Sequence, residues 1–114
     1  MASDIDGVLT QLRKGVLEYC VLALLAEHPS YGLELAHRLG RHRVLFASEG
    51  TLYPLLSRLR RQGWVDSTWR ESTAGPPRRY YELTDSGRTA LATFVQAWQP
   101  FSADVRTVLA GVDR

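Results

Sequence analysis

The fold that this sequence predicts is decided by residues 48–81, which read SEGTLYPLLSRLRRQGWVDSTWRESTAGPPRRYY. Steps of three and four residues place four leucines on one helix face that must point to the core: Leu52, Leu55, Leu56 and Leu59. Ser48 can cap this helix, Gly63 can end it, and Pro54 should loosen its first turns because proline has no N–H to donate. The rest predicts a two-stranded ribbon: an alternating strand, a turn rich in Gly and Pro and a return strand, over residues 64–70, 72–77 and 78–83.

Polar and basic side chains lie on the side of this helix opposite the leucines: Thr51, Tyr53, Ser57, Arg58 and Arg61. A helix fits the major groove of B-DNA, and a basic ribbon tip can reach the flanking phosphates. In the ribbon, Gly75 permits a tight turn, and strand alternation sends Arg78 and Arg79 to opposite faces, where either can contact the minor groove or the backbone. The order helix, strand, basic turn, strand is that of a winged helix-turn-helix, so DNA binding is the first hypothesis. The alternative is that Tyr53 packs against the ribbon and the arginines are only solvated.

The positive charge of the chain is concentrated in the same segment. Residues 38–79 carry nine arginines against three acidic residues, a net charge of +6. Residues 1–37 have two basic and five acidic residues, and residues 80–114 have three and four, which gives net charges of −3 and −1. Neutralisation of phosphates with release of counterions would make the basic segment a DNA-binding surface. An acidic protein surface would match the same charge, so a winged-helix protein-interaction module is the alternative function.

The composition predicts a single soluble domain. With 114 residues, of which 45% are hydrophobic and 23% charged, the chain is large enough for one core. Cys20 is the only cysteine, so no intrachain disulfide can form, and its apolar helical surroundings indicate a small buried hydrophobe. No signal peptide is visible and no apolar run is long enough to span a bilayer, so we expect a cytoplasmic protein.

No motif indicates an enzyme, a cofactor or a metal site. The sequence has no GxSxG, no phosphate-binding loop and no paired carboxylates on a predicted shared face. His37 and His42 are five residues apart and therefore on different helical faces, and neither CxxC nor HxxxH spacing occurs. We expect neither catalysis nor a bound metal.

Two further helices are expected before the quoted stretch. Apolar residues at three- and four-residue steps predict one helix from about Val8 to Glu27. Ser30 can cap a second helix, Gly40 can end it, and its apolar side would consist of Leu33, Leu35, Ala36 and Leu39. In the ribbon, Trp64 and Trp69 are expected to be sheet and core residues.

The last helix, opened by Thr84 and the following Asp-Ser-Gly, carries an unbroken heptad pattern. Alternating steps of three and four residues connect Leu91, Phe94, Trp98, Phe101, Val105, Val108 and Val112. The first half of this seam can pack on the protomer's own first helix, but the second half extends beyond the winged-helix body. Pro100 should bend the helix between the two halves. A second copy of the chain is the expected partner of the second half, so the sequence predicts a homodimer.

The runs TLYPLLSRLRRQGWV and RRYYELTDSGR, in this order and spacing, resemble those of the PadR family of bacterial transcriptional regulators. Tyr31-Gly32 also fits, and the resemblance covers about residues 12–112. It implies a mainly α fold with a small antiparallel β wing and a dimeric repressor on a palindromic operator, from the subfamily with a single short C-terminal helix. The winged helix-turn-helix would span residues 8–83 and the dimerisation helix residues 84–112 of the same compact unit. The candidate DNA contacts are then Tyr31, Ser48, Thr51, Tyr53, Ser57, Arg58, Arg61, Gly75, Arg78 and Arg79.

Within that subfamily the chain is similar to a multidrug-sensing regulator of Lactococcus, in which planar aromatic drugs stack between two symmetry-related tryptophans at the dimer interface. This similarity implies control of a multidrug or stress-response operon and a drug-stacking role for Trp98. Ser102 stands where the relative has an acidic residue, so the similarity does not extend to selectivity for cationic drugs. If Trp98 only packs in the seam, the protein is a DNA-binding regulator without an effector, which is the other alternative. The remaining candidate ligand contacts are Leu12, Gly15, Tyr19 and Val95.

Overall fold

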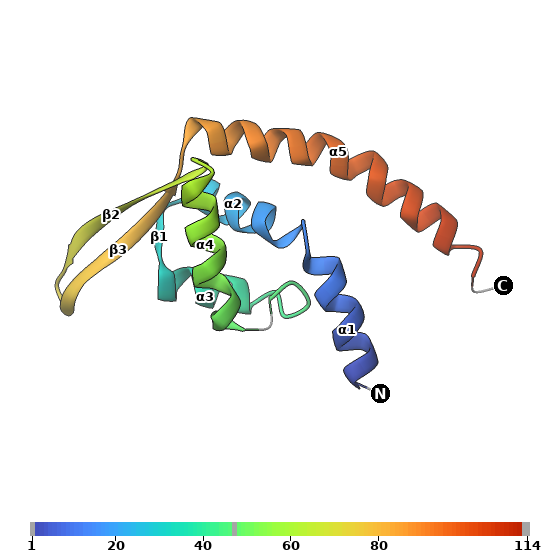
Figure 1. The fold of residues 1–114 in the computed structure, drawn as a ribbon, viewed down its shortest axis with the longest axis horizontal. Helices are drawn as coiled ribbons and strands as arrows, with labels where there is room; N and C mark the ends of the chain where they lie inside the picture. Colours follow the sequence, from blue (N-terminus) through green and yellow to red (C-terminus); the bar gives the residue numbers. More distant parts are fainter. Residues whose placement is uncertain (1, 47, 113–114) are drawn as a thin grey trace.

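Helix α4 (Leu52–Arg61) lies in the centre of the core. In the computed structural model, which describes residues 2–46 and 48–112, all four leucines of this helix are buried, as predicted. They pack in one cluster with apolar residues of α2 (Leu17–Glu27) and α3 (Gly32–Gly40), namely Val21, Leu22, Leu25, Leu35, Ala36 and Leu39. These three helices form the body from which a β-hairpin and two further helices project (Figure 1).

A small antiparallel sheet closes the core on another side. Its strands are β1 (Ser30–Tyr31), β2 (Val65–Ser72) and β3 (Gly75–Leu83), in the order β1-β3-β2. Val65, Tyr81 and Leu83 are buried at the base of the β2–β3 hairpin, while the rest of the hairpin extends away from the helices as a wing (Figure 1). The expected fold class, mainly α with a small antiparallel wing, is confirmed.

The turn of the wing is shorter than the predicted 72–77. Ser72 pairs with Gly75, so the chain reverses at Thr73 and Ala74. Gly75 lies in β3 and has no positive φ, so the expectation that its conformational freedom makes the turn is wrong. Both strands are longer than predicted because pairing along the hairpin continues through the residues that have turn chemistry.

The predicted ends of the helices are largely confirmed. The Ser48 hydroxyl accepts a hydrogen bond from the Gly50 N–H and caps a 3-10 turn, η1 (Glu49–Thr51), which leads directly into α4. This 3-10 turn agrees with the loosening expected from Pro54, which lies in the first turn of α4. Gly63 follows α4 with a φ of 79°, a left-handed conformation that glycine adopts without strain. The Thr84 hydroxyl accepts from the Gly87 N–H and caps α5 (Asp85–Leu109).

The single helix expected from Val8 to Glu27 is wrong, because the structure has two. Helix α1 (Ala2–Arg13) is separated from α2 by a break in which Gly15 has a φ of 78°. The Arg13 Nε donates to the Val44 carbonyl oxygen at 2.9 Å, which ties the end of α1 to the loop after α3. The apolar spacing continues across the break because α1 has its own apolar side, but Ile5, Val8 and Leu12 are exposed in the protomer.

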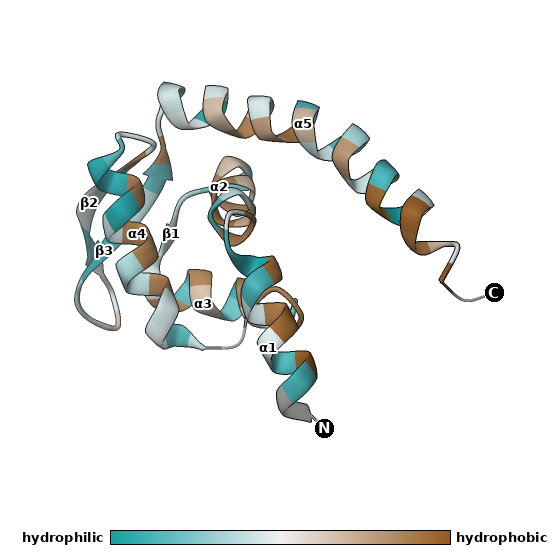
Figure 2. Cartoon of the chain, turned by 45° about the vertical axis from the view of Figure 1, so that its right-hand side comes forward, coloured by the Kyte–Doolittle hydropathy of each residue, from teal (hydrophilic) through white to brown (hydrophobic). Residues whose placement is uncertain are grey.

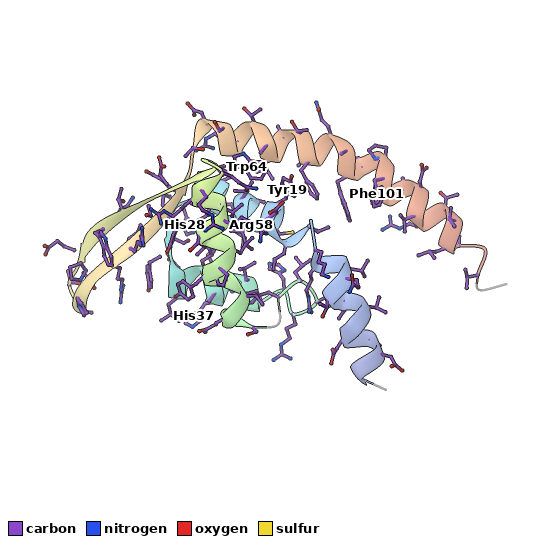
Figure 3. All side chains as sticks on the ribbon, viewed as in Figure 1. Tyr19, His28, His37, Arg58, Trp64 and Phe101 are labelled. Carbon is purple, nitrogen blue, oxygen red and sulfur yellow. The ribbon has the colours of Figure 1, made fainter. Side chains whose placement is uncertain are left out.

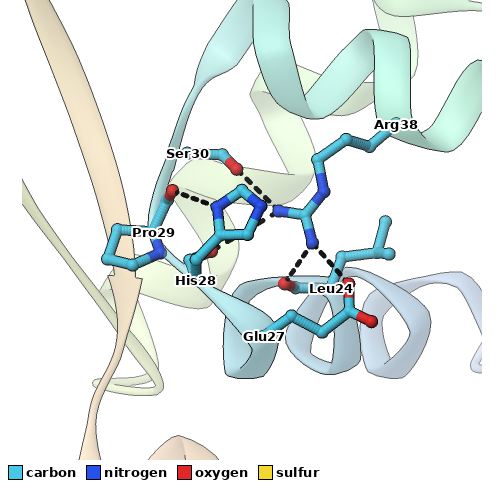
Figure 4. A network of polar contacts seen from close by, with 6 residues as sticks. All are labelled: Leu24, Glu27, His28, Pro29, Ser30 and Arg38. Carbon is cyan, nitrogen blue, oxygen red and sulfur yellow. Dashed lines mark hydrogen bonds and ion pairs between the residues drawn. The ribbon is translucent and has the colours of Figure 1, made fainter.

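Ser30 is not the cap of α3, which is a second correction. It lies in β1 and is fully buried, and its hydroxyl accepts a hydrogen bond from the Arg38 guanidinium at 2.7 Å (Figure 4). The same guanidinium donates to the Leu24 carbonyl at 2.7 Å and forms an ion pair with Glu27 at 2.6 Å. Helix α2 has no basic residue in its last turn, so Arg38 of α3 supplies the positive group at its C-terminal end. The Ser30 hydroxyl, which was expected to cap α3, instead takes part in a polar network around Arg38 that connects α2, α3 and the sheet.

Helix α5 passes through Pro100 without interruption and curves in its second half (Figure 1). Its first half packs on α2, where Leu91 and Phe94 are partly buried. Its second half extends past the body, and hydrophobic stretches recur along it to the free end (Figure 2). Val108 is 74% exposed and Val112 is 72% exposed, so the second half of the seam has no partner within the described protomer. In α3, Leu33 is also exposed, although it was expected on the apolar side.

Candidate nucleic-acid interface

The outward side of α4 and η1, named here the recognition face, carries exposed side chains of the predicted kind: Thr51, Tyr53, Ser57 and Arg61. All four are exposed in the protomer and are therefore accessible to a ligand. Arg60 is also exposed and was missed by the sequence analysis. Its spacing of seven residues from Tyr53 and three from Ser57 would have placed it on the same side. The recognition face therefore presents two arginines and three hydroxyl groups, one of them on the aromatic ring of Tyr53.

Tyr53 is held by the start of α3 and not by the wing. A methyl group on Gly32 would lie 2.5 Å from the Tyr53 hydroxyl oxygen and 2.7 Å from its ring, so only a glycine leaves room for this packing. The ring is nevertheless 48% exposed. Tyr53 is thus fixed at one edge and open at the other, which suits a side chain that contacts DNA with little loss of entropy.

Arg58 is exposed and has an acidic partner within the protomer. Its guanidinium forms an ion pair with Glu18 of α2 at 3.0 Å, on the flank of α4 that faces the break between α1 and α2. Gly15 lines the same surface groove. The prediction that Arg58 is either solvated or turned toward DNA overlooked a partner 40 residues away in sequence. An ion pair of this exposure contributes little to stability, so Arg58 can exchange Glu18 for another anion.

One side of the wing carries a cluster of tyrosines and arginines from three strands. The Arg78 guanidinium lies 4.3 Å from the ring centre of Tyr31, and the Arg70 guanidinium lies 4.5 Å from that of Tyr80. The two rings meet edge to face at 5.4 Å. These cation–π contacts orient both arginines without neutralising their charge. Arg70 was not among the predicted contacts, although it lies directly across the strands from Arg78.

Arg79 lies on the opposite side of the wing, as strand alternation predicted. Its Nε donates to the Ser67 hydroxyl at 2.9 Å, and its guanidinium is 6.0 Å from the ring centres of Trp69 and Tyr81. Trp69 itself is 68% exposed, so its expected place in the core is wrong. Trp64 is partly buried against the core cluster, as expected. The two tryptophans differ in burial because the hairpin extends beyond the helices. Only its base, near Trp64, packs against them.

A series of aromatic rings connects the body to α5 (Figure 3). Tyr19 of α2 lies between Trp64 at 5.8 Å and Phe94 at 4.3 Å, and its ring is nearly parallel to that of Phe94, with an angle of 10° between the planes. The series continues along α5 from Phe94 to Trp98 at 5.8 Å and on to Phe101 at 6.3 Å. The structure therefore brings together Tyr19 and Trp98, two of the predicted ligand contacts, through Phe94.

Comparisons with known proteins agree with this geometry. Residues 21–93 match the transcriptional regulator PadR-like family. The chain belongs to the PadR-like family. A solved PadR-like transcriptional regulator from Bacillus cereus is 40% identical, has a TM-score of 0.78, and the match covers 87% of this chain and 96% of that one. A PadR-family regulator structure from Eggerthella lenta is 32% identical with a TM-score of 0.81, covering 95% and 94% of the two chains. A transcriptional regulator of Mycobacterium tuberculosis is 31% identical over 97 residues, which are 85% of this chain and 89% of that one.

The PadR-like family consists of DNA-binding transcriptional regulators, which are not enzymes. Membership in this family implies that the regulator binds DNA. No helix in the described ranges has the length and apolar character needed to cross a membrane. In the same ranges no three His, Cys, Asp or Glu side chains are grouped to hold a metal ion. Burial raises the pKa of the Cys20 thiol, which favours its protonated form.

Of the other predicted ligand contacts of this PadR-like regulator, Leu12 and Gly15 lie apart from the ring series. Leu12 is on α1 and is 62% exposed, and Gly15 lies at the helix break near Arg58. Val95 is exposed on α5 beside Phe94. Phe101 extends the series by one ring and was assigned only to dimerisation, although aromatic residues at positions 94, 98 and 101 already have the spacing of one helix side.

Proposed function

We propose that this PadR-like regulator is a homodimeric repressor of a multidrug or stress-response operon in the cytoplasm, and that a planar aromatic molecule releases it from a palindromic operator. The observation that carries the proposal is the ring series from Trp64 to Phe101, which begins in the core and ends on the exposed half of α5. Trp98 is 39% exposed and Phe101 is 63% exposed, so the last rings of the series keep open surface.

The second copy follows from the exposed half of the seam. Phe101, Val105 and Val108 are exposed along one side of α5, and burial of such a side is strongly favourable in water. An identical helix presents the same side, so a two-fold axis pairs the seam with itself. The two recognition faces of such a dimer would read two half-sites related by the same axis, which makes the operator a palindrome.

The ligand class follows from the open surface of Trp98. Phe94 lies against one side of Trp98, and a two-fold axis near the seam would bring the partner's tryptophan toward the other side. A flat ring between two indoles has the offset stacking that aromatic systems prefer. Ser102, one turn after Trp98, donates to its own helix at the Gln99 carbonyl and offers no negative charge. Neutral planar aromatics are therefore the expected effectors, in preference to cationic ones.

Two adjacent residues of α2 connect this site with the recognition helix. Tyr19 stacks on Phe94 at 4.3 Å, and Glu18 holds Arg58 of α4 at 3.0 Å. A ligand that shifts α5 against α2 would move both contacts and change the separation of the two recognition faces. It would act as an inducer only if it binds one arrangement better than the other.

The test is fluorescence-detected binding of the protein to duplex from its own promoter, with and without a planar aromatic dye. We expect the dye to weaken operator binding by the natural protein and to leave binding by Trp98→Ala unchanged. Gln99→Ala, on the adjacent exposed position, is the matched control and should respond like the natural protein. If the dye changes no operator affinity, the protein is a regulator without this effector. If Trp98→Ala is a monomer, the residue is a structural part of the seam.

A further inference from the structure

Trp69 is the largest exposed side chain of the wing. It lies in β2, four residues before Thr73, where the chain reverses, and 68% of its surface is accessible. The guanidinium of Arg79 lies 6.0 Å from the centre of its ring. Tryptophan is enriched at interfaces, where a partner covers its large ring.

The surroundings of Trp69 are positively charged. Its cross-strand neighbour is Arg79, whose Nε is fixed by the Ser67 hydroxyl at 2.9 Å. Arg70 and Arg78 lie on the opposite side of the same hairpin, each held over a tyrosine ring. From position 69 to position 79 the chain has three arginines and a single acidic residue, Glu71. An aromatic ring among oriented arginines has the chemistry that nucleic acids recognise, because it offers both stacking or packing area and phosphate neutralisation.

The position of the wing favours DNA over a second copy of the chain as the partner that covers Trp69. The hairpin projects from one end of the molecule, and the free half of α5 lies at the other end (Figure 1). A second copy bound through α5 would therefore leave Trp69 uncovered. The recognition face belongs to α4, and Trp69 lies in β2, the next element along the chain, so both belong to the helix-and-wing part of the molecule.

We propose that Trp69 is a direct DNA contact, whose ring packs on the deoxyribose wall of the minor groove while Arg79 beside it neutralises the adjacent phosphate. The inference rests on the DNA-binding function of the family and is independent of any effector. Trp69 supplies the apolar part of the wing's affinity, and the arginines supply the ionic part. These parts differ in their response to salt, because only neutralised phosphates release counterions.

The experiment measures the dissociation constant for promoter duplex at several salt concentrations by fluorescence anisotropy. Trp69→Ala is expected to weaken binding roughly 5- to 100-fold, the effect of removing an aromatic group from a nucleic-acid contact, with an unchanged salt slope. Trp69→Phe keeps a packing ring and should retain most of the affinity. Thr68→Ala, an exposed neighbour on the other side of the strand, is the matched control and should bind like the natural protein.

Two results would overturn the inference. If Trp69→Ala binds the duplex as tightly as the natural protein, DNA does not cover this ring. If it lowers the salt slope by about one, the residue acts by positioning Arg79 and not by its own contact. Circular dichroism and thermal unfolding of each variant show whether the hairpin is intact, and Trp69→Phe decides the case if the alanine variant is unstable. Failure here leaves dye-dependent release untouched, because that depends on Trp98 in the natural protein.

Discussion

Helix α4 and the second half of α5 have the same apolar pattern and opposite surroundings. In α4, Leu52, Leu56 and Leu59 repeat at steps of four and three and are fully buried by α2, α3 and the sheet. In α5, Phe101, Val105 and Val108 repeat at the same steps of four and three and are exposed. The difference teaches that periodicity specifies which side of a helix is apolar, while the partner of that side depends on the rest of the fold or on another chain.

The largest expected effect concerns the buried leucines of α4. Leu56→Ala leaves a cavity in the core and should lower the free energy of unfolding by about 2–5 kcal/mol, measured by urea denaturation. Val108→Ala removes two methyl groups from the exposed half of α5 and should cost less than about 0.5 kcal/mol at protein concentrations where the chain is monomeric. If both variants lost the same free energy of unfolding, Val108 would belong to the protomer's own core and would not differ from Leu56.

The exposed apolar side of α5 is tested by introducing a charged residue at position 108. Val108→Asp would bury an unpaired carboxylate if α5 pairs with a second copy, so the dimer dissociation constant should rise at least about 100-fold. Sedimentation velocity over a concentration series measures this change. Ala103→Asp, an exposed position on the other side of the helix, is the control and should leave the assembly intact. A dimer that tolerates Val108→Asp would show that the seam is not its interface.

The helical body, unlike the second half of α5, is also held by a polar network, in which Arg38 contacts Ser30, Leu24 and Glu27. Arg38→Ala removes the donor of the buried Ser30 hydroxyl and the positive group at the end of α2. We expect a loss of about 1.5–3 kcal/mol in the free energy of unfolding, as for hydrogen bonds that involve a charged group. Arg38→Lys should recover only part, because one ammonium cannot reach all acceptors. Arg41→Ala, at an exposed position just after α3, should be nearly neutral; a similar loss there would mean that net charge matters and the polar network does not.

Two arginines of α4 sharpen the comparison within the DNA-binding body. Arg61→Ala should lower the slope of log Kd against log salt by about one, since Arg61 lies on the recognition face. Arg58→Ala should lower it less, because Glu18 already neutralises Arg58 at 3.0 Å. Arg106→Ala, on α5, is the control and should not change the slope. Anisotropy titrations with promoter duplex check all three, and an equal effect of Arg58→Ala would mean that DNA displaces Glu18.

The smallest expected effect concerns the thiol of α2. Burial raises the pKa of Cys20, so less thiolate is present at a given pH than in the unfolded chain. Alkylation by iodoacetamide at pH 8 should therefore be slower in the folded protein than in urea. The raised pKa contributes slight stability that is fully present below the unfolded pKa and is lost as pH rises through the folded one. Alkylation at equal rates in both states would show that the α2 thiol is not protected.

The sequence by itself determined the elements whose causes are local. The leucines of α4 follow from their spacing, the caps at Ser48 and Thr84 from a hydroxyl before a helix, and the end at Gly63 from the left-handed conformation that glycine adopts. The opposite directions of Arg78 and Arg79 follow from the two-residue period of a strand. Each of these features depends on residues within a few positions of one another, so no knowledge of the fold was needed.

Only the tertiary structure decided which side chains meet across the chain. Glu18 of α2 forms an ion pair with Arg58 of α4, and Arg38 donates to the Ser30 hydroxyl, which therefore does not cap α3. The length of the hairpin leaves Trp69 outside the core. The break at Gly15 likewise replaces one expected helix by two. Such choices are made between groups far apart in sequence that compete for one partner, and their outcome depends on which elements the fold brings within contact distance. A local pattern contains no information on that distance.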